Sequence, residues 1–222
     1  AFDIHILKRG GAEVSYPAYV VEAAAKRFAD DPERMREALT KSIGAGLPGA
    51  ADVYDLDKLR SLLDLYRDVD ADALRRRLVD FLSELAPLAQ AIGVRLCCHP
   101  DDPPWPLLGL PRIMSTEADY RTVLETVDLP ANGITFCTGS LGARPDNDLP
   151  GMVRRLGARI HFAHLRNVRR EGGNIPGSFH EDQHLEGDTD MVAIVGALLD
   201  DERRRKMAGR GDGEIPMRAD HG

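Results

Sequence analysis

The hydrophobic pattern of the chain changes near residue 93, from helical spacing to short apolar runs. Between residues 16 and 91, apolar side chains recur three or four positions apart, as they do on one face of a helix. Pro32 is placed to begin one helix, and Asp55 is placed to cap another. Asp70 opens a further helix with one apolar stripe, which we expect to be buried: Leu74, Leu78, Phe81, Leu82 and Leu85. The first part of the chain is therefore predicted to be helical.

Beyond Gly93, short strands alternate with helices. Strands are expected at 94–98, 133–137, 159–163 and 215–219, helices near 115–127, 149–156 and 191–207, and a long loop at 165–187. This alternation is typical of parallel βαβ units. Four such strands amount to half of a (β/α)8 TIM barrel, which typically needs about 250 residues. We expect an α/β protein in which 94–222 form the C-terminal half of the barrel. The helical region 1–93 is expected to pack on it within one domain.

Composition narrows the classes of protein that remain. The 222 residues are 43% hydrophobic, and no apolar run approaches the roughly 20 residues that span a bilayer. The net charge of -7 argues against nucleic acid as the main partner. Three cysteines, two of them adjacent, do not form a disulfide framework. The sequence opens with no signal peptide, so we expect a cytoplasmic protein with no membrane partner.

Residues of the kind that bind metals stand at the end of each predicted strand. Because side chains alternate along a strand, His99, Cys137, His164 and Asp220 could converge from four neighbouring strands. In α/β proteins, ligands bind at this edge of the sheet. Two imidazoles, a thiolate and a carboxylate make a complete ligand set for a divalent ion. This recurrence indicates a metal-dependent enzyme.

Several motifs of the chain closely resemble the mannonate dehydratase family. They are His99-Pro-Asp-Asp-Pro-Pro, Leu110-Pro-Arg-Ile, Cys137-Thr-Gly-Ser, His164-Leu-Arg, Phe179-His-Glu-x-x-His-Leu-x-Gly-Asp-x-Asp190 and Asp220-His-Gly. The resemblance also includes His5-Ile-Leu-Lys-Arg9, Gly46-Leu-Pro-Gly49 and Leu65-Tyr-Arg-Asp68. It implies a TIM barrel that removes water from D-mannonate to give 2-keto-3-deoxy-D-gluconate in hexuronate breakdown. Mn²⁺, or alternatively Fe²⁺, is the implied cofactor, and a homodimer is the expected assembly.

The resemblance also implies roles for individual residues. The family's metal ligands fall on the four strand-end residues named above, and Asp220 and His221 are the implied catalytic pair, with His221 in proton transfer. A guanidinium suits a carboxylate, so Arg166 and Arg218 are expected to bind the substrate acid. Ser140 and His180 are expected near the substrate. The family's first four strands precede Ala1, and a tyrosine linked to catalysis follows Gly222, so the sequence is expected to continue at both ends.

Three alternatives remain at this stage. His180-Glu-Asp-Gln-His184 matches the H-E-x-x-H motif of zinc peptidases, which requires both histidines on one helical face. The neighbouring glycines indicate a loop instead, which we expect to cover the site as a lid. A xylose-isomerase-like sugar isomerase would interconvert aldose and ketose without loss of water. A catalytically inactive fragment of the barrel would neither bind metal nor turn over substrate.

Overall fold

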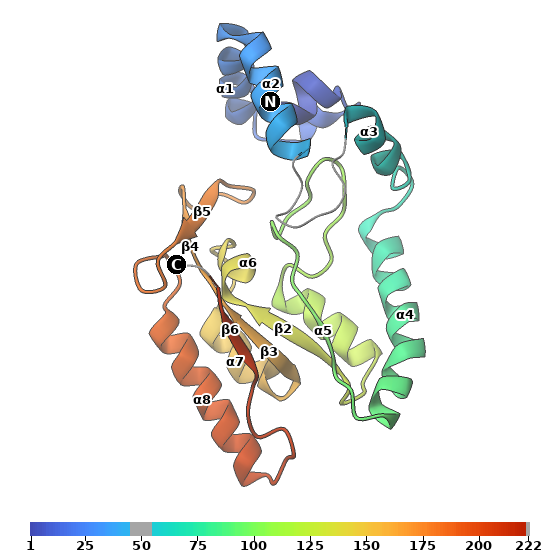
Figure 1. The fold of residues 1–222 in the computed structure, drawn as a ribbon, viewed down its shortest axis with the longest axis vertical. Helices are drawn as coiled ribbons and strands as arrows, with labels where there is room; N and C mark the ends of the chain where they lie inside the picture. The colour runs from blue at the N-terminus through green and yellow to red at the C-terminus, as the bar shows by residue number, and fades with distance from the viewer. Residues whose placement is uncertain (45–54, 221–222) are drawn as a thin grey trace. The chain divides into compact units, whose positions relative to one another are not determined.

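The structure, a computed structural model, describes residues 1–44 and 55–220 and divides the chain into two compact units (Figure 1). Residues 1–70 and 106–111 form the first unit, and 71–105 with 112–222 form the second. None of the described helices is long and apolar enough to cross a membrane. The predicted division at residue 93 stays a prediction.

The first unit is helical, as the sequence predicts. Its helices are α1 (Ala18–Asp30), α2 (Pro32–Gly44) and α3 (Leu56–Asp64), with short helical turns at Phe2–Leu7 and Ala12–Ser15. Helix α2 begins at Pro32, as expected. The predicted cap of α3 is also confirmed, because Oδ1 of Asp55 accepts a hydrogen bond from the Lys58 amide at 2.7 Å. Phe2, Ile6 and Leu7 form the buried centre of this unit.

The second unit contains all the predicted site residues that the structure describes, and it alternates strands with helices. Its helices are α4 (Ala71–Ala91), α5 (Glu117–Thr126), α6 (Thr138–Gly142), α7 (Leu149–Leu156) and α8 (Met191–Met207). Its strands are β1 (Leu96–Cys98), β2 (Asn132–Cys137), β3 (Ile160–Leu165), β4 (Asn167–Arg170), β5 (Phe179–Asp182) and β6 (Met217–Ala219). The four predicted strands correspond to β1, β2, β3 and β6.

These four strands form one parallel sheet in the order β1-β2-β3-β6. Their register pairs Cys97 with Gly133, Cys137 with His164, and His164 with Arg218. Paired residues of a parallel sheet share a face, so the sheet brings Cys137, His164 and Arg218 onto one face near its carboxyl edge. The predicted α/β organisation is confirmed.

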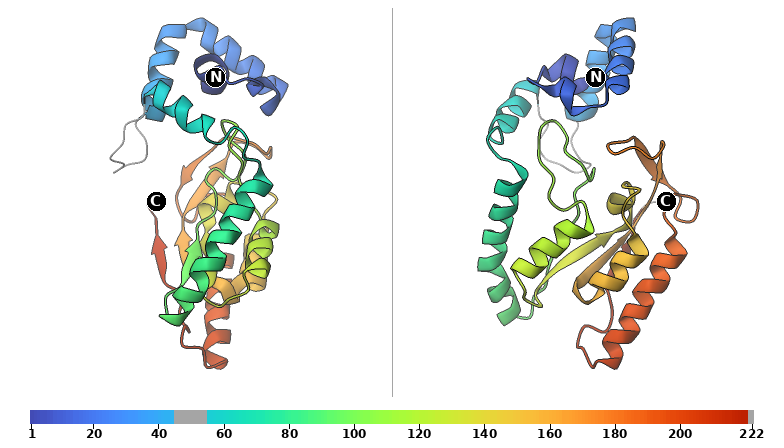
Figure 2. Two further views of the ribbon diagram at one scale, coloured as in Figure 1. Left: turned by 90° about the vertical axis from the view of Figure 1, so that its right-hand side faces the viewer. Right: turned by 180° about the vertical axis from the view of Figure 1, so that it is seen from behind.

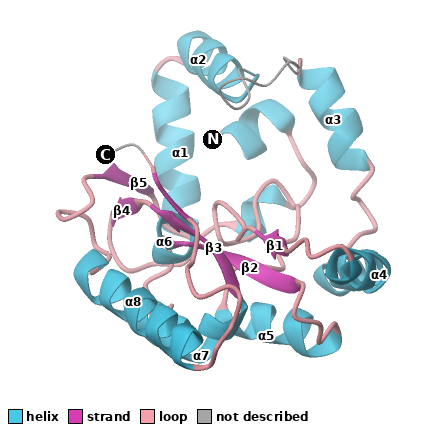
Figure 3. Ribbon diagram, turned by 60° about the horizontal axis from the view of Figure 1, so that its bottom comes forward, coloured by secondary structure: helices cyan, strands magenta, loops and turns pink. Residues whose placement is uncertain are grey.

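The core of this unit lies between the sheet and helices that pack along one side of it (Figure 3). Helices α7 and α8 lie side by side in this layer (Figure 2). Ile134 and Phe136 of the fully buried β2 point into the core. The predicted stripe of α4 is confirmed in part: Leu82 is buried, Leu74, Leu78 and Leu85 are partly buried, and Phe81 is 57% exposed. Phe81 and Leu82 lie about 100° apart around the helix axis, which places Phe81 at the edge of the stripe that faces solvent.

The segment predicted as a long loop, 165–187, contains an antiparallel hairpin. Strand β4 pairs with β5, and Arg169 lies opposite His180. The sequence gives little sign of these strands, because polar side chains occupy most of their positions. Two apolar contacts stabilise the hairpin: Val168 is fully buried, and the ring of Phe179 packs edge-on against Trp105 at 5.6 Å. The loop prediction is therefore wrong for these residues.

Candidate metal centre

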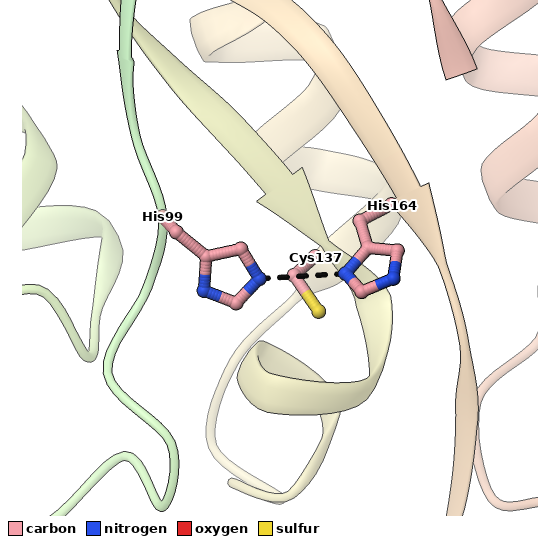
Figure 4. A group of neighbouring side chains, drawn as sticks. All are labelled: His99, Cys137 and His164. Atoms are coloured by element: carbon pink, nitrogen blue, oxygen red, sulfur yellow. Dashed lines mark hydrogen bonds between the residues drawn. The ribbon is translucent and has the colours of Figure 1, made fainter. Parts of the chain in front are cut away.

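Three of the four predicted ligands meet at the carboxyl edge of the sheet. The ligand atoms of His99, Cys137 and His164, here called the donor cluster, all lie within 4.8 Å of one another (Figure 4). His99 follows β1, Cys137 ends β2 and His164 lies near the end of β3. The parallel order of these strands explains how residues so distant in sequence come together.

Cys137 is the fully buried member of the donor cluster. It ends β2 and directly precedes helix α6, where the Ser140 amide donates to its Sγ at 3.5 Å. The Ser140 hydroxyl lies 3.3 Å from the same sulfur. Burial alone would raise the pKa of the Cys137 thiol, but hydrogen bonds with His99 and Ser140 lower it below its ordinary value. The lower pKa favours the thiolate, which is the form that binds metals.

The two histidines face each other across this thiol. Nε2 of His99 lies 3.4 Å from Nδ1 of His164, and Nδ1 of His99 lies 2.8 Å from the carbonyl oxygen of Pro100. If the imidazole donates to Pro100 through Nδ1, its Nε2 is left as a ligand atom that points into the donor cluster. The hydrogen bond to Cys137 raises the pKa of His99, whereas partial burial lowers the pKa of His164.

The donor cluster fits a divalent transition metal. Two imidazole nitrogens and one thiolate sulfur suit such ions, and their proximity allows one ion to contact all three. The lowered pKa of Cys137 adds to the fit, because a bound cation requires the deprotonated sulfur. The donor set alone does not choose among manganese, iron and zinc.

Asp220, the fourth predicted ligand, lies on the other side of His164. Its Oδ2 is 3.1 Å from Nε2 of His164, whereas Nδ1 of that ring faces His99. Asp220 is therefore placed to orient the His164 ring. A carboxylate on the far nitrogen of a ligand histidine is common at metal sites. His221, the predicted proton-transfer residue, lies outside the described residues.

The predicted substrate-binding residues are distributed around the same edge. Arg218 is exposed and is the register partner of His164. The guanidinium of Arg166 contacts the carboxylates of Asp102, at 2.6 Å, and Glu181, at 3.4 Å. Ser140 is fully buried beside Cys137, whereas His180 is exposed on β5.

The peptidase interpretation of the H-E-x-x-H motif is not supported. His180 lies in strand β5 and His184 follows it, so the two rings do not share a helical face. Nε2 of His184 is 3.0 Å from the carbonyl oxygen of Leu165, which indicates a structural role.

Sequence reasoning missed residues that build the site without belonging to the donor cluster. Asp101, two residues after His99, accepts hydrogen bonds from the Ile113 and Met114 amides at 2.8 and 2.7 Å. Thr138 is fully buried and links α6 to the end of β3, because its hydroxyl bonds with both the amide and the carbonyl group of Arg166. The signal for Thr138 is its place directly after Cys137, where a helix begins.

The fold and the donor cluster define an α/β protein with a candidate metal centre at the carboxyl edge of a parallel sheet. A family model described as "D-mannonate dehydratase (UxuA)" matches residues 15–222. The chain therefore belongs to the D-mannonate dehydratase family.

Individual relatives agree with this assignment. The chain is 57% identical over 222 residues to "Mannonate dehydratase 1" of Agrobacterium fabrum and 47% identical to "Mannonate dehydratase" of Saccharophagus degradans. All of this chain is covered in both cases, but only 55% of each relative, so the chain spans about half the length of these relatives. The crystal structure of mannonate dehydratase from Streptococcus suis serotype 2 matches with a TM-score of 0.61 and 35% identity, over 70% of this chain and 42% of that one.

Proposed function

We propose that the chain carries the metal centre of an enzyme that dehydrates D-mannonate to 2-keto-3-deoxy-D-gluconate in hexuronate breakdown. The observation that carries the proposal is the donor cluster at the carboxyl edge of the sheet, in a chain of the D-mannonate dehydratase family. In a TIM barrel this edge holds the active site. We further propose that the four-stranded sheet is the C-terminal half of such a barrel, in a cytoplasmic homodimer.

His99, Cys137 and His164 would hold the ion, and Mn²⁺, or alternatively Fe²⁺, is the proposed cofactor. When bound, the ion would neutralise the substrate carboxylate and the negative charge that develops beside it when the C2 proton leaves. Asp220 would keep the His164 ring in place through its contact with Nε2. Its role as a fourth ligand stays a prediction.

The remaining steps require groups that bind the substrate and move protons. Arg218 shares a face with the donor cluster and would pair with the substrate carboxylate. Arg166, Ser140 and His180 are proposed around the substrate. An elimination needs a base for the C2 proton and an acid for the departing C3 hydroxyl. His221 is proposed for one of these roles, because the ordinary pKa of an imidazole lies near neutral pH.

Direct assay of the chain with metal and D-mannonate tests the proposal. The chain is loaded with Mn²⁺ or Fe²⁺, and the products are identified by NMR. Formation of a 3-deoxy-2-keto acid with loss of water is the expected result. In a parallel assay with an aldose in place of D-mannonate, its conversion to the ketose would instead show a sugar isomerase. Metal binding without either reaction would contradict the proposed activity of this chain and leave the metal centre standing.

A further inference from the structure

Ser140 joins the candidate metal centre to a carboxylate that does not belong to it. The Ser140 side chain is fully buried, and its Oγ lies 3.3 Å from Sγ of Cys137 and 3.2 Å from Oδ2 of Asp102. A hydroxyl group has one proton, so it can donate fully to only one of two acceptors. Whichever acceptor binds this proton more strongly decides how much of the Ser140 hydrogen bond the sulfur receives.

Arg166 weakens Asp102 as a competitor for that proton. Its guanidinium donates to the same Oδ2 atom of Asp102 at 2.6 Å, a charge-assisted contact of the strong kind. This contact neutralises much of the charge on the oxygen that faces Ser140. The hydroxyl proton is therefore shared between Asp102 and the sulfur of Cys137, at 3.2 and 3.3 Å, and is not held by the carboxylate alone.

The packing around Arg166 fixes this arrangement. A Cβ added to Gly139 would lie 2.1 Å from Nε of Arg166, so the first turn of α6 and this side chain are in direct contact. Thr138, at the start of the same helix, hydrogen-bonds through its hydroxyl to the backbone carbonyl and amide groups of Arg166. Helix α6 thus positions Ser140 and Arg166 together, on either side of Asp102.

We propose that Ser140, Asp102 and Arg166 are positioning residues that set how strongly the sulfur of Cys137 donates to a bound metal ion. Ser140 weakens the donation by its hydrogen bond, and Asp102, restrained by Arg166, limits that bond. This inference rests on the proposed metal centre. Hydrogen bonds to ligand atoms tune metal sites, and changes in such partners typically alter metal affinity by about 10- to 100-fold.

The test uses the chain loaded with Co²⁺, whose thiolate-to-metal charge-transfer band reports donation from sulfur. Ser140→Ala removes the donor, so its band is expected at lower energy than in the wild-type chain, with Co²⁺ affinity changed about 10-fold. Asp102→Ala frees the Ser140 proton for Cys137, so its band is expected at higher energy. A general loosening of the site would move both bands in the same direction, and that result would overturn the inference.

Ser115→Ala is the matched control. Ser115 is also buried, and its hydroxyl donates to a neighbouring carboxylate, Asp101, at 3.0 Å. The charge-transfer band of Ser115→Ala is expected to coincide with that of the wild-type chain.

If the bands of Ser140→Ala and Ser115→Ala both coincide with the wild-type band, the inference is wrong, but the metal centre is still supported. Absence of a thiolate band in the wild-type chain would overturn the metal centre and this inference together. Should Ser140→Ala fail to fold, a lower-energy band in Asp102→Ala decides against the inference.

Discussion

Strand β3 carries one histidine toward each end of the sheet, and the two have opposite environments. His161 is 7% exposed, with Nε2 2.9 Å from the carbonyl oxygen of Pro130 and Nδ1 3.3 Å from Arg95. Burial, and then the charge of Arg95, lower its pKa to about 4. His164, three residues later, is only half-buried and faces a second imidazole and a thiol.

The charges around the two ends differ in the same way. Near His161, each nitrogen of the buried Arg205 guanidinium donates a hydrogen bond. Its acceptors include the Asp201 carboxylate and the Ile160 carbonyl oxygen, both at 2.7 Å. At the other end, the donor atoms of His99, Cys137 and His164 are directed at one another. Polar groups thus stabilise the fold at the amino end of the sheet and are arranged for a ligand at its carboxyl end, the edge where parallel α/β sheets bind ligands.

The largest expected effect is on metal binding at the carboxyl end. His99→Ala removes one donor, and its Mn²⁺ affinity is expected to fall by at least about 100-fold, because even indirect partners of ligands contribute 10- to 100-fold. His161→Gln is the control from the other end of the sheet and should retain wild-type affinity. Titration calorimetry measures both variants, and an equal loss in the two would remove the distinction between the ends.

A large effect on stability is expected at the amino end. Asp201→Ala removes the nearer of the two carboxylates that pair with the buried Arg205, at 2.7 Å against 3.5 Å for Asp212. Loss of one partner of a buried pair typically costs about 3–5 kcal/mol. Asp200→Ala is the matched control, because Asp200 pairs with Arg203 on the surface, where such pairs contribute about 0.5 kcal/mol. Urea unfolding gives both free energies. Equal losses would show that the Asp201–Arg205 pair is not buried in solution.

His161 is expected to make stability depend on pH. Its pKa is about 4 in the folded chain and about 6.5 when unfolded, so the unfolded state binds the extra proton between these values. Stability is therefore complete above about pH 6.5 and falls as the pH decreases, by about 2 kcal/mol between pH 7 and pH 5. His161→Gln should reduce this slope in urea unfolding, and an unchanged slope would contradict the assignment.

The smallest expected effect is that of Arg95→Ala. Arg95 is 39% exposed and pairs with Asp212 at 2.6 Å, so its loss should lower stability by no more than about 1 kcal/mol. The charge of Arg95 also lowers the pKa of His161, so NMR titration should find that pKa raised in the variant. Metal affinity should not change, and a marked loss would mean that the two ends are coupled.

The sequence predicted the parts of the fold that depend on a repeated pattern. The strand that ends at Cys137 and the strand that carries His164 near its end were predicted, as were α7 and α8, because short apolar runs alternate with helical segments in this part of the chain. The hairpin of β4 and β5 could not be predicted in the same way, because few of its positions are apolar. Its stability depends on Trp105, more than 60 residues earlier than β4, and such contacts carry no local signal.

The candidate site was predictable to a similar degree. Residue types and strand positions identified the donor cluster, because parallel strands place their carboxyl ends at one edge. The partners of those donors could not be predicted. Asp101 and Asp102 are adjacent and chemically identical, yet one binds backbone amides and the other lies between Ser140 and Arg166. The two side chains point in different directions because of how the loop turns, and residue type alone does not predict that turn.

X-ray absorption spectroscopy of the Mn²⁺-loaded chain tests the central claim most directly, because it reports the atoms bound to the ion. The predicted spectrum contains one sulfur neighbour from Cys137 and the outer-shell scattering of two imidazoles, from His99 and His164. A shell of oxygen atoms without sulfur or imidazole would contradict the claim that this edge of the sheet is the metal centre.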